Sequence, residues 1–284
     1  MNTDYIQRFL FEELEIRGRL VCLSKAWRAM IEARNYPPQF VTLLGETTAL
    51  GVLLGANQKS GGRVTLQVRG NGPLSMLVVE CTAGLQIRGM AHFSADNQST
   101  PASPAGMREL LGDGRFALTL DDGASEQLYQ SIVPLAGDTL SETFAGYLAR
   151  SEQVESSLLL MADGDAVCGL LLEKLPGADA RDSDGWNRMT RLAATLTLAE
   201  SREVQPYDLL TRLFPEELLR VYKLLPVEYD CPYDVKKVED MLKSLGRAEV
   251  DAILAEKGEV LVKNEMCNHE YRFDAQAIET MFDA

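Results

Sequence analysis

Between Arg63 and Lys174, apolar residues recur at every second position in a series of short stretches. The first is RVTLQVRG, where Val64, Leu66 and Val68 alternate with polar side chains. A period of two is typical of a strand with one buried face. The turns GNGP and AG connect this first stretch to LSMLVVECT and then to LQIRGMAHF, which predicts an antiparallel meander of three strands. A further strand pair is expected in GRFALTLDD and YQSIVPL, and a hairpin about the Gly164–Asp165 turn in SSLLLMAD and AVCGLLLEKLP.

Helical patterns flank these strands. Residues 24–34 and 38–54 are expected to form helices, and a loop is expected at 94–104. A further helix is predicted in DTLSETFAGYLARSEQ, where Thr139 and Glu142 have the spacing of a capping box. Runs of strands with helices to either side predict an α+β fold with an antiparallel sheet, not a doubly wound parallel one.

The composition changes at residues 177–189, GADARDSDGWNRM, which are rich in Gly and Asp and predict a linker. Beyond this point apolar residues recur at three or four, as at Trp186, Met189 and Leu196. The following stretch, YDLLTRLFPEELLRVY, is expected to form two short helices that are split before Pro215.

The pattern therefore predicts three parts: an N-terminal α+β domain at 1–176, a helical linker at 177–226 and a small C-terminal α/β domain at 227–284. In the last part, two apolar helical stripes each end at a glycine. A strand, a turn at Cys267–His269, a return strand and a closing helix follow. A unit of about sixty residues gains little from burial, so we expect an additional covalent or metal staple.

The net charge limits the partners. The chain has 28 Lys and Arg against 42 Asp and Glu, a net charge of −14, without a basic stripe. Such a surface repels phosphate, so nucleic acid and anionic membranes are not expected partners. No apolar run approaches the roughly 18 residues of a membrane span. The N-terminal stretch has the pattern of neither a signal nor a transit peptide, so a cytoplasmic protein is expected.

Five cysteines without paired spacing do not predict a disulfide framework. Cys22, Cys81 and Cys168 lie in apolar, strand-like stretches and are expected to be small buried hydrophobic residues. Cys231 and Cys267 lie in polar, Tyr- and Asn-rich surroundings, YDCPYDVKK and KNEMCNHEYRF. These two are the candidates for chemistry.

Each of these two segments is similar to half of a zinc knuckle, with one thiol in place of two. A structural zinc ion needs four ligands at tetrahedral positions. Cys231, Cys267 and His269 provide three, with Asp230, Asp234 or water as a fourth. Zinc is therefore a possible but weakened cofactor, because much of the binding energy of such a site comes from the thiolates.

The residues around the two cysteines follow a longer pattern. Tyr229, Leu245–Gly246, EVDAILAEKGEV, Tyr271 and Phe273 occur in the order seen in the C-terminal domain of the redox-regulated heat-shock protein 33 chaperones, which this region resembles. The resemblance covers essentially the whole chain, through segments upstream: YIQRFLFEELEIRGRLV, QVRGNGPLSMLVVE, LQIRGMA, GDTLSETFAGYLARSEQ and GLLLEKLPG.

The chain departs from that family at the metal-binding thiols. The family's Cys-x-Cys corresponds to Cys231–Pro232–Tyr233, and its Cys-x-x-Cys to Asn264–Glu265–Met266–Cys267. The resemblance implies a zinc ion held by four thiolates, neighbouring disulfides on oxidation, and unfolding of the linker and C-terminal domain. Because one cysteine of each pair is missing here, neither of those disulfides can form.

Ligands of one zinc ion lie close together, so the resemblance implies that Cys231 and Cys267 face each other and can form one disulfide. That bond would close a loop of about 35 residues and stabilise the small domain by about 4 kcal/mol. Oxidation would then lock the domain instead of releasing it. Two alternatives stay open: both thiols are inert and heat alone drives the function, or a three-ligand zinc site persists through His269.

The function implied by the resemblance is that of an ATP-independent holdase, a stress-response chaperone that binds unfolded or aggregation-prone client proteins. Its activity would be gated by unfolding of residues 177–284, with a homodimer as a possible active form. We find no catalytic motif, and GNGPLS is a hairpin turn and not a phosphate loop, so no enzyme is expected. The alternatives are a thiol oxidoreductase using Cys231 or Cys267, and a purely heat-activated holdase.

Overall fold

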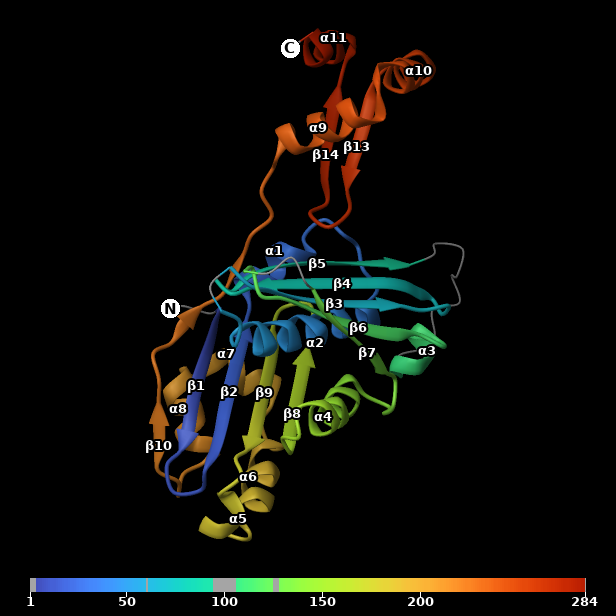
Figure 1. Cartoon of the computed structure of the whole chain (residues 1–284). Helices are drawn as coiled ribbons and strands as arrows, with labels where there is room; N and C mark the ends of the chain where they lie inside the picture. Colours follow the sequence, from blue (N-terminus) through green and yellow to red (C-terminus); the bar gives the residue numbers. More distant parts are fainter. Residues whose placement is uncertain (1–3, 60, 94–105, 125–127, 284) are drawn as a thin grey trace. The chain divides into compact units, whose positions relative to one another are not determined.

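The computed structural model describes residues 4–59, 61–93, 106–124 and 128–283. It divides the chain into two compact units, Met1–Asp230 and Cys231–Ala284, and each unit is described by itself (Figure 1). Residues 177–226, the expected linker, belong to the first unit. The predicted loop at 94–104 lies outside the described residues. Within the described part of the chain, no helix has the length and apolar character needed to cross a membrane.

The first unit contains two mainly antiparallel sheets, which we call sheet A and sheet B. The path of sheet A runs β10-β1-β2-β9-β8, and β11 also pairs with β1. Its strands are β1 (Tyr5–Phe11), β2 (Ile16–Leu23), β8 (Ser156–Ala162), β9 (Val167–Lys174), β10 (Leu219–Val221) and β11 (Leu225–Pro226). Sheet A therefore joins the beginning of the chain to the end of the predicted linker.

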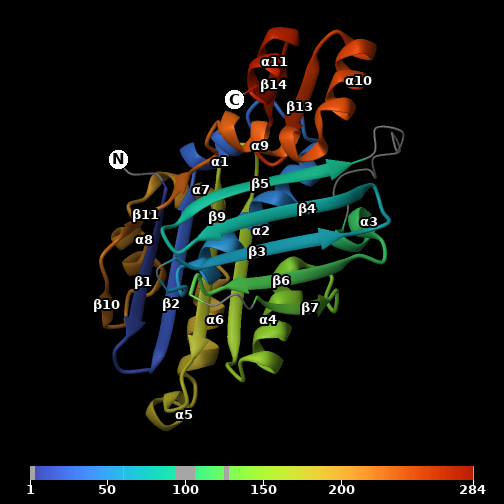
Figure 2. The ribbon, with the colours of Figure 1, turned by 45° about the horizontal axis from the view of Figure 1, so that its top comes forward.

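Sheet B carries the predicted meander, in the order β12-β5-β4-β3-β6-β7, and Figure 2 shows β5, β4, β3 and β6 side by side. Its strands are β3 (Arg63–Arg69), β4 (Leu74–Thr82), β5 (Gln86–Phe93), β6 (Arg115–Asp121), β7 (Tyr129–Pro134) and β12 (Glu228–Tyr229). Every pair is antiparallel except β12 with β5, which is parallel. The α+β class and the antiparallel meander predicted from the period of two are both confirmed.

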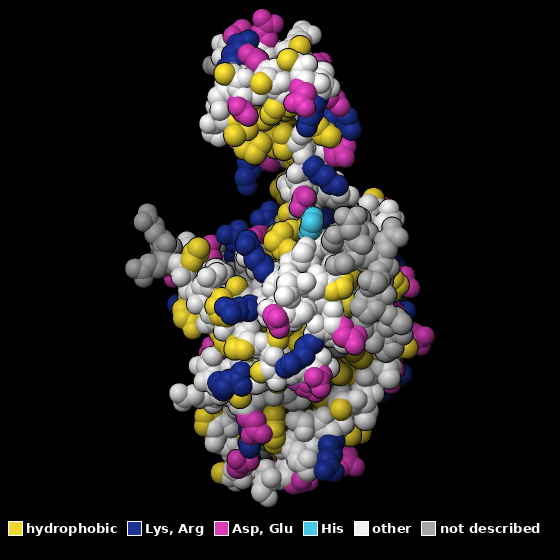
Figure 3. Space-filling view, turned by 90° about the vertical axis from the view of Figure 1, so that its right-hand side faces the viewer, with side chains coloured by type: hydrophobic (Ala, Val, Ile, Leu, Met, Phe, Trp, Pro, Cys, Tyr) yellow, Lys and Arg dark blue, Asp and Glu magenta, His cyan; other side chains and the backbone are white. Residues whose placement is uncertain are grey.

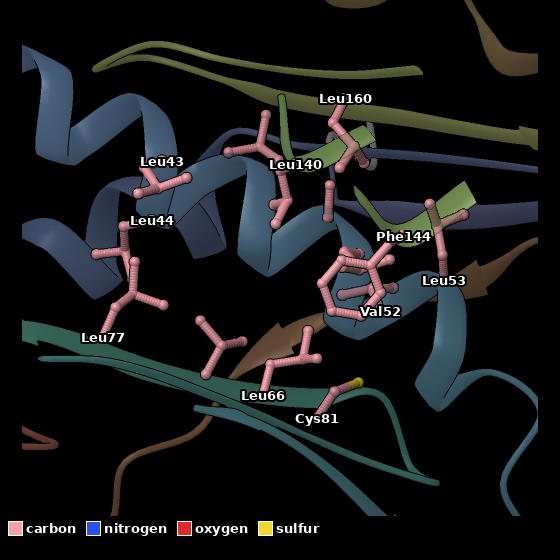
Figure 4. Packing of buried hydrophobic residues seen from close by; sticks show 14 of the residues in the cluster. Leu43, Leu44, Val52, Leu53, Leu66, Leu77, Cys81, Leu140, Phe144 and Leu160 are labelled. Atoms are coloured by element: carbon pink, nitrogen blue, oxygen red, sulfur yellow. The ribbon is translucent and has the colours of Figure 1, made fainter. Parts of the chain in front are cut away.

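The main core lies around α2 (Pro38–Gly55), which packs between the two sheets (Figures 1 and 4). The helix is apolar on nearly all sides, as expected of a helix covered by protein on both faces. Gly55 allows a close approach, since a Cβ atom there would lie 2.7 Å from the Cys81 sulfur. Side chains from both sheets and from α2 meet in this core: Val52, Leu53, Leu66, Leu77, Cys81 and Leu160.

Two helices that were predicted from the sequence border this core. α1 (Lys25–Ile31) begins where Asp4 accepts hydrogen bonds from the backbone N–H groups of Ser24 and Ala26, at 2.7 and 3.0 Å. α4 (Leu140–Ser151) begins with the predicted capping box, because the Thr139 hydroxyl accepts from the Glu142 N–H at 3.1 Å. A shorter helix, α3 (Met107–Leu111), precedes β6.

The expected linker forms four helices and then strands. The helices are α5 (Ala178–Arg181), α6 (Gly185–Ala193), α7 (Leu198–Glu203) and α8 (Pro206–Leu213). The prediction of a second short helix after Pro215 is wrong, because this stretch contains β10 paired with β1. The apolar residues there fit either period, and the unpaired edge of β1 decides in favour of a strand.

The second unit consists of three helices and a hairpin, in agreement with the pattern. The elements are α9 (Val235–Leu245), α10 (Arg247–Lys257), β13 (Val260–Asn264), β14 (His269–Phe273) and α11 (Ala275–Asp283). Gly246 and Gly258 end the first two helices with φ of +92° and +78°, a region that favours glycine. The core is small: Val238, Leu242, Val250, Val260, Tyr271, Phe273, Ile278 and Met281.

Candidate functional site

Cys231 and Cys267 are joined by a disulfide, with their Cα atoms 5.5 Å apart and a sequence separation of 36. Cys231 opens the second unit, just before α9, and Cys267 lies in the turn between β13 and β14. The bond therefore ties the beginning of the unit to its hairpin. Cys267 is buried, with 6% of its surface exposed, and Cys231 is half-buried.

The turn that carries Cys267 is shaped by two asparagines. The Asn264 side chain accepts a hydrogen bond from the Cys267 N–H at 3.3 Å. Asn268 has φ of +55°, in the left-handed region that asparagine tolerates better than most residues. These residues direct the Cys267 side chain into the unit, although Asn264 occupies a position where the family pattern has a thiol.

Aromatic side chains fix the segment that follows Cys231, on the other side of the disulfide. The rings of Tyr233 and Tyr271 are stacked, 4.4 Å apart at an interplanar angle of 14°. The Tyr271 hydroxyl accepts from the Asp234 N–H at 3.1 Å, and the Tyr233 hydroxyl donates to the Glu270 carbonyl at 3.2 Å. The Asp234 carboxylate in turn accepts from Lys237 N–H at 3.0 Å and caps α9. The segment after Cys231 is thus held against β14.

The residues do not fit a zinc site in this state. Both cysteines are in the disulfide, and Tyr233 and Asn264 make the contacts just described. Over the ranges of the chain that the structure describes, no three His, Cys, Asp or Glu side chains are grouped to hold a metal ion. The proposed ligands Asp230, Asp234 and His269 therefore do not complete a set with the cysteines.

A second feature of functional interest is the face of sheet A that α6, α7 and α8 cover. Alternate residues of β1, β2 and β9 point to this side and form a second core with the helices. Phe9, Phe11 and Phe214 meet there, with the Phe11 and Phe214 rings 4.8 Å apart and nearly perpendicular. All three are almost fully buried. We call this face the linker-covered face.

Ion pairs hold the linker helices to each other and to the sheet. Arg188 of α6 donates to Glu217 at 2.9 Å and to Asp182 at 3.0 Å. Arg202 of α7 pairs with Asp163 at the end of β8. These pairs are partly exposed and weak individually. Burial of the apolar face is therefore the larger contribution to docking of the linker.

Cys231 and Cys267, the candidate pair predicted from the sequence, are brought together in the structure. The strand β1 and the aromatic cluster of the linker-covered face were not predicted, whereas β2 coincides with the strand-like stretch around Cys22. One signal was present in YIQRFLF, where Tyr5, Gln7, Phe9 and Phe11 are every second residue. The expected burial of the other three cysteines is confirmed.

His92, one of the two histidines of the chain, contacts Ser75. It lies exposed near the end of β5, and its Nδ1 is 3.0 Å from the Ser75 hydroxyl. The GNGP segment turns β3 into β4, with the Gly70 N–H donating to the Ser75 carbonyl at 3.1 Å. The hairpin interpretation of this segment is therefore confirmed.

These features define a class of protein in which a two-sheet α+β unit, with a helix between the sheets, is followed by a small α/β unit that contains a disulfide. A family model described as "Hsp33 protein" matches residues 4–274. The chain belongs to the Hsp33 family.

Relatives with known names agree with this assignment. The chain is 37% identical to a 33 kDa chaperonin of Methylobacillus flagellatus, over 99% of this chain and 94% of the relative. It is also 37% identical to a 33 kDa chaperonin of Chromobacterium violaceum, over 99% and 95%. The crystal structure of the 33 kDa chaperonin of Thermotoga maritima has the same fold, with a TM-score of 0.83 at 20% identity over 99% of this chain and 98% of the other. Family membership supports a chaperone function.

Proposed function

We propose that this protein is an ATP-independent holdase, a non-enzymatic chaperone of the cytoplasm that binds unfolding client proteins under stress, with heat as the trigger and the oxidation state of Cys231 and Cys267 setting how readily it opens. Its binding surface would become available when the linker at 177–226 and the C-terminal domain at 227–284 unfold. The observation that carries the proposal is the linker-covered face, an apolar sheet surface closed only by short helices.

The apolar side chains of this face suit weak binding of many different apolar client segments. Phe9, Phe11 and Leu20 are each no more than 1% exposed while the helices are in place. Uncovering a Phe or Leu side chain costs about 1.5–3 kcal/mol of the free energy gained by its burial, and a client segment that covers the side chain again recovers this free energy. A few such side chains give useful affinity without selecting one sequence.

The C-terminal unit adds apolar surface of its own. Its exposed large hydrophobic residues are Tyr233, Val235, Met241, Leu245 and Leu261. Figure 3 shows hydrophobic side chains lying together on this unit, at the top of the view, with charged side chains around them. The net charge of −14 would help to keep an opened form in solution.

The proposed control is the Cys231–Cys267 pair. The disulfide closes a loop within the C-terminal unit, so the oxidised form would be harder to unfold and the reduced form easier. The Asp230 N–H donates to the Ile87 carbonyl at 3.1 Å, and Cys231 follows immediately in the chain. Unfolding of the unit would therefore begin at the residue that follows β12, the short strand that pairs with β5 in sheet B.

An aggregation assay tests the proposal. A heat-denatured client would be mixed with reduced or oxidised protein at two temperatures, and light scattering would be followed at near-stoichiometric ratios. Suppression by the reduced protein at the lower temperature, and by both forms at the higher one, is expected. The Cys231→Ser variant should behave as the reduced form does. Equal suppression by all samples at each temperature would favour a purely heat-activated holdase.

The same samples distinguish a thiol oxidoreductase. Such an enzyme would turn over a dithiol substrate at catalytic ratios, and Cys231→Ser would abolish turnover. Size measurement of each sample would show whether the active form is a homodimer, and metal analysis of protein purified without chelator would test for zinc. Absence of aggregation suppression under every condition would overturn the holdase proposal.

A further inference from the structure

A second pair of cysteines lies inside the first unit, on the linker-covered face. Cys22 of β2 and Cys168 of β9 are directly opposite each other in the antiparallel register. Their sulfur atoms are 3.7 Å apart, although 146 positions separate them in the sequence. Both are reduced and buried, with 4% and 0% of their surfaces exposed.

The surroundings of this pair keep it unreactive while the fold is closed. It lies in a row across sheet A, between Tyr5 of β1 and Met161 of β8. The hydrogen bond with Cys22, and then burial, raise the pKa of the Cys168 thiol, while Ser201 acts in the opposite direction. A thiol held in its protonated form reacts slowly, because the thiolate is the nucleophile.

The cover over the pair is part of the linker. Ser201 belongs to α7 and influences the Cys168 thiol, and α7 packs against β9. Met189 of α6 and Leu209 of α8 contribute to the same core. Access of a small oxidant to the sulfurs therefore requires that α7 leave the sheet.

We infer that Cys22 and Cys168 form a second redox site, a dithiol that a hydroperoxide oxidises to a cross-strand disulfide once α7 is released. This site is distinct from Cys231–Cys267, and its oxidation does not depend on holdase activity. The two strands already place the sulfurs in register, so a small approach of the side chains completes the bond.

The reaction balances with hydrogen peroxide as the oxidant. One thiolate attacks the O–O bond and becomes a sulfenic acid, and the leaving hydroxide takes a proton to give water. The sulfur of the second cysteine then attacks the sulfur of the sulfenic acid. The S–S bond forms, the S–O bond breaks, and the oxygen leaves with the proton of the second thiol as a second water. In total the two thiols lose two electrons and two protons to one peroxide.

The product would covalently join β2 to β9, the two neighbouring inner strands of sheet A, close to one end of each strand. A cross-link over so long a loop restricts the unfolded chain strongly. It would hold the sheet together during the time when its covering helices are absent. The oxidised sites would therefore act in the same direction, each keeping its own unit folded.

A pair of cap variants tests the role of α7. The Thr197 hydroxyl accepts from the Glu200 N–H at 3.3 Å and caps α7, as Thr139 caps α4 on the opposite face of the sheet. Both threonines are exposed, so neither change should prevent folding. Loss of a cap of this kind should raise the open population of its helix about fivefold.

Full-length wild type, Thr197→Ala and Thr139→Ala would be treated with hydrogen peroxide, alkylated and mapped without reduction by mass spectrometry. We expect a Cys22–Cys168 linked peptide that forms about fivefold faster in Thr197→Ala and at the wild-type rate in Thr139→Ala. Cys81, buried and with its pKa raised by burial to about 12, should stay a free thiol as an internal control.

Two results would overturn the inference. One is that Cys22 and Cys168 both remain free at a temperature where amides of the linker exchange readily. The other is that both cap variants form the bond at the same rate. Neither depends on aggregation suppression, so failure of the holdase proposal would leave this test intact.

Discussion

Loss of the Cys231–Cys267 bond is expected to unlock the C-terminal unit. For a sequence separation of 36, the loss of loop constraint in the unfolded chain corresponds to about 4 kcal/mol. A core as small as this one supplies a net stability of only about 3–5 kcal/mol. Reduction should therefore remove most of the stability of the unit.

Hydrogen exchange read by mass spectrometry measures this directly. A change of about 4 kcal/mol corresponds to a roughly thousandfold change in the equilibrium for opening. Peptides covering β13 and β14 should lose protection by up to this factor in reduced protein. The double variant Cys231→Ser, Cys267→Ser should show the same loss with or without reductant, and the core around α2 should be unaffected.

The same hydrogen-exchange measurement shows whether opening of the C-terminal unit also destabilises the linker helices. If residues 185–213 lose protection together with the hairpin, opening of the C-terminal unit loosens the linker. The reasoning would be refuted if β13 and β14 had equal protection in oxidised and reduced protein, because the disulfide would then not limit their opening.

Three further predictions concern the first unit. Phe214→Ala should cost about 3–5 kcal/mol and expose the linker-covered face, giving more binding of a hydrophobic dye than the exposed control Leu218→Ala. Glu173→Gln should lower stability by about 3–5 kcal/mol in urea unfolding, because it leaves Arg19 as a buried charge that has lost its 2.8 Å partner. Burial raises the pKa of Glu46 from 4.5 to about 7, so its neutral form favours the fold and this contribution is lost as pH rises from 4.5 to 7. Glu46→Gln should therefore raise the melting temperature at pH 8 relative to wild type and leave it nearly unchanged at pH 4, and an equal effect at both would contradict the assignment.

Much of sheet B followed from the period of two alone, because each strand has one buried face and a turn sequence at its end. The edge strands β10, β11 and β12 did not. Each has two or three residues and forms only because an unpaired strand of the main body lies beside it. Leu218, Val221 and Tyr222 fit a helical spacing equally well, and pairing with β1 decided the outcome.

The two cysteine pairs show the same limit in another way. Proximity of Cys231 and Cys267 could be expected from the resemblance, since a shared metal position implies closeness. Nothing in the sequence joins Cys22 to Cys168, which are 146 residues apart along the chain. Their register results from the order β1-β2-β9-β8, a property of the whole sheet.

The three short strands between α8 and Cys231 occupy edge positions: β10 and β11 complete the border of sheet A beside β1, and β12 does so for sheet B beside β5. If residues 219–229 detach, two rows of backbone N–H and C=O groups lose their partners. An extended polypeptide can satisfy such rows whatever side chains it carries. Recognition through the main chain would explain how one protein could serve many unrelated clients, since every unfolded chain presents the same amide groups.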